Sequence, residues 1–121
     1  KNALDHLGLE NALVSDEKSV RDADAVILPG VGAFPAAMNK LNESGLVDVI
    51  KEEASKKPFL GICLGMQVIF SKGYEFGETD GLGLIEGSVI KMDEPDHIIP
   101  QMGGNMFTLY TRTRRIAARR T

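Results

Sequence analysis

The chain has 121 residues, enough for one small domain rather than two. Apolar residues make up 43% of it, so a hydrophobic core is possible, and no apolar run is long enough to span a membrane. The single cysteine, Cys63, excludes an internal disulfide, and no stretch has the pattern of a secretory signal. We therefore expect a cytoplasmic protein without a membrane partner.

The net charge of −3 is unevenly distributed along the chain. Residues 111–121 hold five arginines and no acidic residue, whereas residues 1–110 hold nine basic residues and all 17 acidic ones. Such a basic end can contact the phosphates of a nucleic acid, or it can be a solvated terminus. No nucleic-acid recognition motif accompanies the arginines, so a nucleic-acid partner is the least favoured interpretation.

The first half of the chain alternates helical and strand patterns. Residues 1–8 have apolar residues at helical spacing, and a short strand is expected over residues 12–15. The apolar run at residues 25–28, closed by Pro-Gly, is typical of a strand buried on both faces. Pro35 suits the first turn of a helix, which should end at Gly45.

The second half continues this alternation and then changes character. Residues 46–57 predict a helix, residues 59–62 a strand and residues 63–72 another helix. The glycine-rich segment 77–92 predicts a loop that leads into a hairpin or a strand pair. The alternation predicts an α/β fold of three layers, with a mostly parallel sheet and helices on both faces.

Cys63 lies between two glycines in the segment Gly61-Ile62-Cys63-Leu64-Gly65, where a strand is expected to turn into a helix. Small residues on both sides allow a tight turn that projects the cysteine side chain from the top of the sheet. The beginning of a helix favours the thiolate form, and the amide of Leu64 can point at a developing oxyanion. The alternative is that Cys63 is a small apolar filler of the core.

A second oxyanion donor is available in the segment PGVGAF, residues 29–34, which follows the other predicted buried strand. Neighbouring parallel strands end at the same edge of a sheet, so this segment should approach Cys63. Amides of the Val31-Gly32 turn could then serve as donors, because glycine lets the backbone turn an N–H inward. Taken alone, the segment could equally be an ordinary loop between a strand and a helix.

Together, GICLGMQ at residues 61–67, PGVGAF at 29–34 and GLGLIEGSV at 81–89 resemble the class I (triad) glutamine amidotransferases. The likeness is closest to the glutaminase subunits of imidazole glycerol phosphate synthases and covers residues 1–105. It implies a flavodoxin-like fold, glutamine as substrate, and transfer of the ammonia to a synthase partner built on a (β/α)8 barrel. By position, Cys63 would be the nucleophile.

The resemblance also implies roles for residues around the nucleophile. Leu64 and the turn of Val31 and Gly32 would form the oxyanion hole. Gln67 would help to hold the substrate glutamine, as would Gly30 and Gly32 through close approach of the backbone.

The resemblance divides the chain into a partial amidotransferase domain, residues 1–105, and a divergent arginine-rich segment, residues 106–121. Family members carry tryptophan where this chain has Gly104, and they supply a catalytic histidine and glutamate from a later segment without a counterpart here. A cysteine nucleophile needs a base, and the only histidines are His6 and His97. Nothing in the sequence places either of them near Cys63.

The family pattern begins with a strand that precedes residue 1, so we expect a truncated sheet with an exposed strand edge. Such an edge pairs readily with another chain, which predicts a homo-oligomer. Two histidines and one cysteine do not make a metal site, and no nucleotide-binding fingerprint is present, so no cofactor is expected. Two functions remain open: a glutaminase subunit, and a non-catalytic α/β module for oligomerisation or binding.

Overall fold

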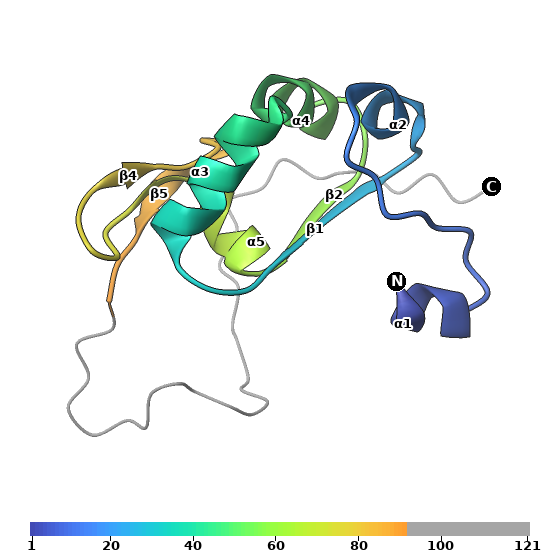
Figure 1. Cartoon of the computed structure of the whole chain (residues 1–121), viewed down its shortest axis with the longest axis horizontal. Helices are drawn as coiled ribbons and strands as arrows, with labels where there is room; N and C mark the ends of the chain where they lie inside the picture. Colours follow the sequence, from blue (N-terminus) through green and yellow to red (C-terminus); the bar gives the residue numbers. More distant parts are fainter. Residues whose placement is uncertain (92–121) are drawn as a thin grey trace, which may run out of the picture.

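A computed structural model of the chain describes residues 1–91. Their helices and strands follow one another in the order shown in Figure 1. The elements are α1 (Asn2–His6), α2 (Glu17–Asp22), β1 (Val26–Gly30), α3 (Phe34–Ser44), α4 (Val47–Ala54), β2 (Phe59–Cys63), α5 (Leu64–Val68), β3 (Phe70–Gly73), β4 (Thr79–Asp80) and β5 (Ile85–Val89). The expected α/β organisation is confirmed, with parallel strands joined through helices.

Two small sheets make up the strand layer of the described residues. β1 and β2 are parallel, and their register aligns Val26 with Phe59 at one end and Gly30 with Cys63 at the other. In the second sheet, β3 lies between β4, which is antiparallel to it, and β5, which is parallel to it. The prediction of a hairpin or strand pair within residues 77–92 is therefore wrong for the described residues: two strands form there, but they lie on opposite sides of β3 and do not pair with each other.

The hydrophobic core lies where α3, α4 and α5 meet the strands. Its fully buried members are Phe34, Met38, Ile50, Leu64, Val68 and Leu82, with Leu28 and Phe59 packed against them from β1 and β2. α3 provides its apolar stripe as expected: it carries proline in its first turn and ends at Gly45, whose φ is 71°. The core thus covers one face of the β1–β2 pair.

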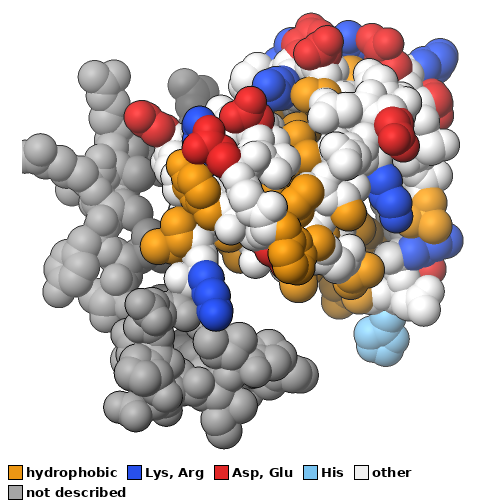
Figure 2. Space-filling view, turned by 60° about the vertical axis from the view of Figure 1, so that its left-hand side comes forward, with side chains coloured by type: hydrophobic (Ala, Val, Ile, Leu, Met, Phe, Trp, Pro, Cys, Tyr) orange, Lys and Arg blue, Asp and Glu red, His pale blue; other side chains and the backbone are white. Residues whose placement is uncertain are grey.

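The other face of β1 and β2 is open within residues 1–91. Burial alternates along both strands, and Ile27, Leu60 and Ile62 are all exposed. The prediction that β1 is buried on both faces is therefore wrong for the described part of the chain. β1 pairs only with β2 there, so one edge of β1 is unpaired. Figure 2 shows how hydrophobic side chains gather in a band on one side of the molecule, bordered by charged ones.

Two further sequence predictions about elements are wrong. Residues 12–15 form no strand, because no neighbouring strand of the described residues pairs with them, and Leu13 and Val14 are exposed. The helix after Cys63 ends at Val68 instead of continuing to residue 72. The carbonyl of Val68 accepts a hydrogen bond from the amide of Leu82 at 2.7 Å, so the chain pairs with the later segment rather than extending the helix.

Helix α2 has no counterpart among the predicted elements. Asp16 begins it by accepting a hydrogen bond from the amide of Ser19 at 2.9 Å, which also lowers the pKa of Asp16. An aspartate followed by a short polar run with one apolar residue, Val20, was the available signal for this helix. Val20 is its one buried residue, and its neighbour is α4, which it contacts through a group of ion pairs.

Ion pairs and a lysine connect α2 to α4. Arg21 contacts both Glu52 and Glu53 of α4. The Lys57 ammonium binds Glu53 at 2.8 Å and also donates to the backbone carbonyls of Val20, Arg21 and Ala23 at 2.6–3.1 Å. Lys57 therefore closes the C-terminal end of α2, whose carbonyls have no partner within the helix.

Candidate functional site

Cys63 lies at the junction of β2 and α5, in a backbone conformation that side-chain-bearing residues rarely adopt. Its φ is 56° and its ψ is −119°, and it serves as the N-cap of α5. A conformation of this kind costs about 1–3 kcal/mol and persists only when the surrounding structure imposes it. Cys63 is exposed, so the alternative of a buried apolar filler does not fit the structure.

The two flanking glycines are required by close approach of the backbone. A methyl group on Gly61 would lie 2.7 Å from the carbonyl oxygen of Gly65 and from the Cα of Met66. One on Gly65 would lie 1.8 Å from the carbonyl oxygen of Leu28, in β1. The pattern Gly-x-Cys-x-Gly therefore has a local physical cause: the turn folds back on β2 while α5 presses against the neighbouring strand.

The PGVGAF segment meets the turn at Cys63 through the strand register. Gly30 is the register partner of Cys63, and a methyl group on Gly30 would lie 3.0 Å from the amide nitrogen of Gly65. Val31 and Gly32 follow directly, with Val31 92% exposed and Gly32 at a φ of 99°. The expected meeting of the two strand ends at one edge is thus observed.

Leu64 and Gln67 occupy the helix that follows the nucleophile candidate. Leu64 is the first residue of α5, and its side chain is only 2% exposed, so its amide is placed directly after Cys63 by a fixed anchor in the core. Gln67 lies one turn further along α5 and is half-buried. These residues therefore cluster with Gly30 around the ends of β1 and β2.

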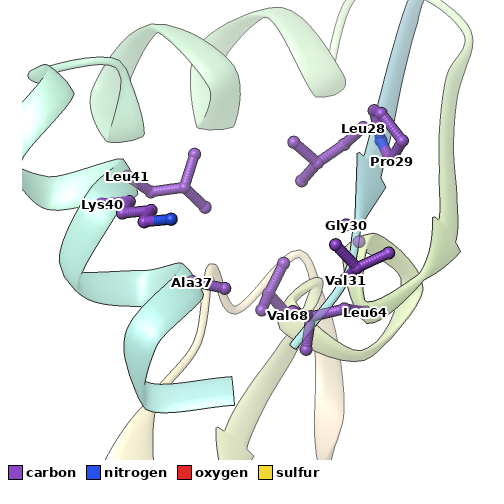
Figure 3. A pocket seen from close by; sticks show the side chains of 10 residues that line it. Leu28, Pro29, Gly30, Val31, Ala37, Lys40, Leu41, Leu64 and Val68 are labelled. Atoms are coloured by element: carbon purple, nitrogen blue, oxygen red, sulfur yellow. The ribbon is translucent and has the colours of Figure 1, made fainter. Parts of the chain in front are cut away.

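A cavity of about 190 Å³ opens beside this cluster, between β1, α3 and α5 (Figure 3). Its walls are almost entirely apolar, and the side chains of Leu28 and Leu41 face each other across it. Lys40 extends along its rim from α3. Gly30, Val31 and Leu64 are among the residues that line the cavity, so it borders the backbone of the candidate site.

No histidine is placed beside Cys63 within the described residues. His6 is the one histidine among residues 1–91, and the helix that carries it, α1, lies well away from α5 in Figure 1. His97, the Gly104 segment and the arginine-rich residues 106–121 lie outside the described residues. Within residues 1–91, no group of three or more metal-ligating side chains is found and no helix is long and apolar enough to cross a membrane.

Comparison with known proteins identifies the family. The model of the family "Glutamine amidotransferase class-I" matches residues 1–116. The chain belongs to the class-I glutamine amidotransferases.

Individual members of this family are closely similar to the chain. It is 52% identical over 104 residues to the imidazole glycerol phosphate synthase subunit HisH of Lactococcus lactis, covering 85% of this chain and 51% of that protein. It is 50% identical over 111 residues to the subunit HisH of Lacticaseibacillus casei, covering 90% and 53%, and 48% identical over 114 residues to that of Sulfurimonas denitrificans, covering 89% and 55%. The chain therefore spans about half the length of the curated relatives it matches.

Proposed function

We propose that this chain carries the nucleophile part of a glutaminase site that serves an imidazole glycerol phosphate synthase. The strained, exposed Cys63 at the end of β2, opposite Gly30, is the observation that carries the proposal. Membership in the class-I glutamine amidotransferases and the similarity to HisH subunits support it. The finer three-layer, flavodoxin-like arrangement, with a domain over residues 1–105, belongs to the same proposal.

In this proposal, the Cys63 sulfur adds to the side-chain amide carbon of glutamine. The thiol proton passes to a base and then to the departing nitrogen, which leaves as ammonia, and a thioester remains. Water then breaks the thioester bond, releasing glutamate and restoring the thiol. The residue that serves as this base is not assigned within residues 1–91, where His6 is the one histidine.

The oxyanion would form between two backbone segments that already lie together. The Leu64 amide follows the nucleophile, and the Val31-Gly32 turn starts from the register partner of Cys63. Preorganised amides of this kind are worth about 3–4 kcal/mol of transition-state stabilisation each. Gln67 and the Gly30 and Gly32 backbone would hold the glutamine, and a (β/α)8-barrel synthase subunit would receive the ammonia.

The test is covalent capture followed by turnover. A chloromethyl ketone analogue of glutamine should alkylate Cys63, forming a sulfur–carbon bond as chloride leaves, with the adduct located by peptide mass spectrometry. Cys63→Ala is the blank. Glutamate release from glutamine is then measured with and without the barrel subunit of the Lactococcus lactis enzyme. No faster capture of Cys63 by the analogue than by a chloromethyl ketone without the amino-acid group would contradict the proposal.

A second candidate function is oligomerisation or binding without catalysis. The observation that favours it is the exposed apolar face of Ile27, Leu60 and Ile62, next to the unpaired edge of β1. Exposed apolar strand edges associate readily with other chains. Light scattering at micromolar concentration should then report a homo-oligomer that Leu60→Lys weakens. A monodisperse monomer would contradict oligomerisation without bearing on the glutaminase proposal.

A further inference from the structure

We propose that Glu75 is a positioning residue that holds the Val31-Gly32 turn in place beside Cys63. Its carboxylate oxygen Oε2 accepts a hydrogen bond from the backbone amide of Phe34 at 2.8 Å. Phe34 is the first residue of α3, is separated from the turn only by Ala33, and is 41 positions away from Glu75 in the sequence. The catalytic consequence of this contact rests on the proposed glutaminase function.

Glu75 replaces the capping group that α3 lacks at its own beginning. The N-cap of α3 is Ala33, which has no side-chain hydrogen-bond acceptor. Helix N-termini expose unpaired amides and carry partial positive charge, so a carboxylate is a favourable partner there. The partner comes instead from the turn between β3 and β4, across the fold.

The same β3–β4 hairpin also holds the side chain of Phe34. Phe34 is 1% exposed, and a methyl group on Gly73 would lie 2.6 Å from its ring. One on Gly81 would lie 3.2 Å from the ring Cζ. The ring fits beneath the hairpin only because these two positions are glycine, so both the ring and the amide of Phe34 are fixed by one segment.

Residues 31–33 therefore lie between two residues whose positions are fixed, here called anchors. The anchor before the turn is Gly30, aligned with Cys63 by the strand register and close to the backbone of Gly65. The anchor after it is Phe34. Because Val31 is 92% exposed, its side chain does little to fix the turn, and the direction of the amides at 31 and 32 depends on the two anchors.

A role limited to capping α3 makes a different prediction from a positioning role. A cap alone would alter the free energy of unfolding and leave the selectivity of Cys63 unchanged. A positioning residue alters how well the site recognises a carbonyl that becomes an oxyanion, while the intrinsic reactivity of the thiol stays the same. The ratio of two alkylation rates at Cys63 separates these cases.

The experiment compares Glu75→Ala, Glu75→Gln and the control Glu78→Gln on the full chain. Glu78 lies in the same hairpin turn but pairs with Lys72, not with Phe34. For each variant, the rate of Cys63 alkylation by the chloromethyl ketone analogue of glutamine is divided by the rate with iodoacetamide. We expect Glu75→Ala to lower this ratio about tenfold, Glu75→Gln to restore most of it through its amide oxygen, and Glu78→Gln to leave it unchanged.

An unchanged ratio in Glu75→Ala, or a loss that Glu75→Gln does not rescue, would overturn the proposal. The glutaminase function fails if the wild-type Cys63 reacts no faster with the glutamine analogue than with a chloromethyl ketone that lacks the amino-acid group. In that case, amide hydrogen exchange at Gly32 tests the positioning role by itself. Exchange about tenfold faster in Glu75→Ala than in both the wild type and Glu78→Gln supports that role. Equal exchange in all three overturns it.

Discussion

The backbone carbonyl oxygen of Leu28 occupies the place that any side chain on Gly65 would need. The methyl group of an alanine there would lie 1.8 Å from that oxygen, which is far inside van der Waals contact. Gly65 belongs to α5 and Leu28 to β1, so this contact sets how closely the helix after Cys63 approaches the neighbouring strand. The geometry of the turn between β2 and α5 at Cys63 thus depends on Gly65, two positions beyond the nucleophile candidate.

Gly65→Ala should therefore destabilise the fold by about 3 kcal/mol or more, because α5 or β1 has to move. Urea unfolding followed by circular dichroism measures this change. Gly45→Ala is the matched control. Gly45 has a φ of 71°, which disfavours a side chain, but no atom lies within 4 Å of an added methyl group. Only the backbone penalty of about 1 kcal/mol is therefore expected there. Equal losses in the two variants would contradict the close-contact explanation.

Backbone strain at Cys63 predicts that glycine at this position gives a more stable protein than alanine, the reverse of the usual order in a helix. Cys63→Gly should be more stable than Cys63→Ala by about 1 kcal/mol, because glycine adopts a φ of 56° without the Cβ penalty. At an ordinary exposed helix position the order is reversed, and Ala36→Gly on α3 should cost about 1 kcal/mol. Denaturant unfolding of the three variants gives the sign directly. A Cys63→Gly variant less stable than Cys63→Ala would exclude the strain.

Acid should weaken the connection between α2 and α4. Lys57, together with Lys56, holds the pKa of the Glu53 carboxyl at about 2, well below its usual 4.5. A lowered pKa in the folded state means that this contribution to stability is fully present above pH 5 and is lost as the pH falls toward 2. The urea midpoint of the wild type should thus fall more steeply over this range than that of Glu53→Gln.

The matched control for that experiment is Glu43→Gln, which removes one negative charge from an exposed position on α3. It should reproduce the wild-type acid profile. A Glu53→Gln variant with the same steepness as the wild type would show that other carboxylates carry the acid dependence.

Removing the ring of Phe34 should have the largest effect on the core. The side chain is 1% exposed and fills the space beneath Gly73 and Gly81, so Phe34→Ala leaves a cavity and should cost about 3–5 kcal/mol. Phe34→Leu retains most of the apolar volume and should cost less than half as much. Thermal unfolding of both variants measures the difference, and a loss below 1 kcal/mol in Phe34→Ala would contradict the packing described for the hairpin.

The elements nearest the candidate site were the easiest to predict from the sequence. The apolar runs before Gly30 and Cys63 predicted β1 and β2, and the proline and glycine at the two ends of α3 predicted that helix. These signals are local, because each depends on residues within a few positions. The glycines around Cys63 are of the same kind, since the turn itself requires them.

Contacts between distant segments account for what the sequence did not predict. The helix after Cys63 ends at Val68 because later residues pair with residues 68–73, which no periodicity reveals. The contact of Glu75 with Phe34 has no local signature either, because 41 residues separate the two. The burial of β1 on both faces was inferred from apolar composition, but exposure depends on which segments cover the strand.

Lys57 couples the candidate site to the far end of its strands. It immediately precedes the Pro58 carbonyl that pairs with the amide of Val26, and its ammonium holds the backbone at Ala23, just before β1. The Lys57 ammonium thus holds the beginnings of β1 and β2 together, at the ends of the strands opposite to Cys63. Substitution of Lys57 would remove these contacts at the start of the two strands, whose register places Gly30 opposite Cys63, without changing any residue of the candidate site.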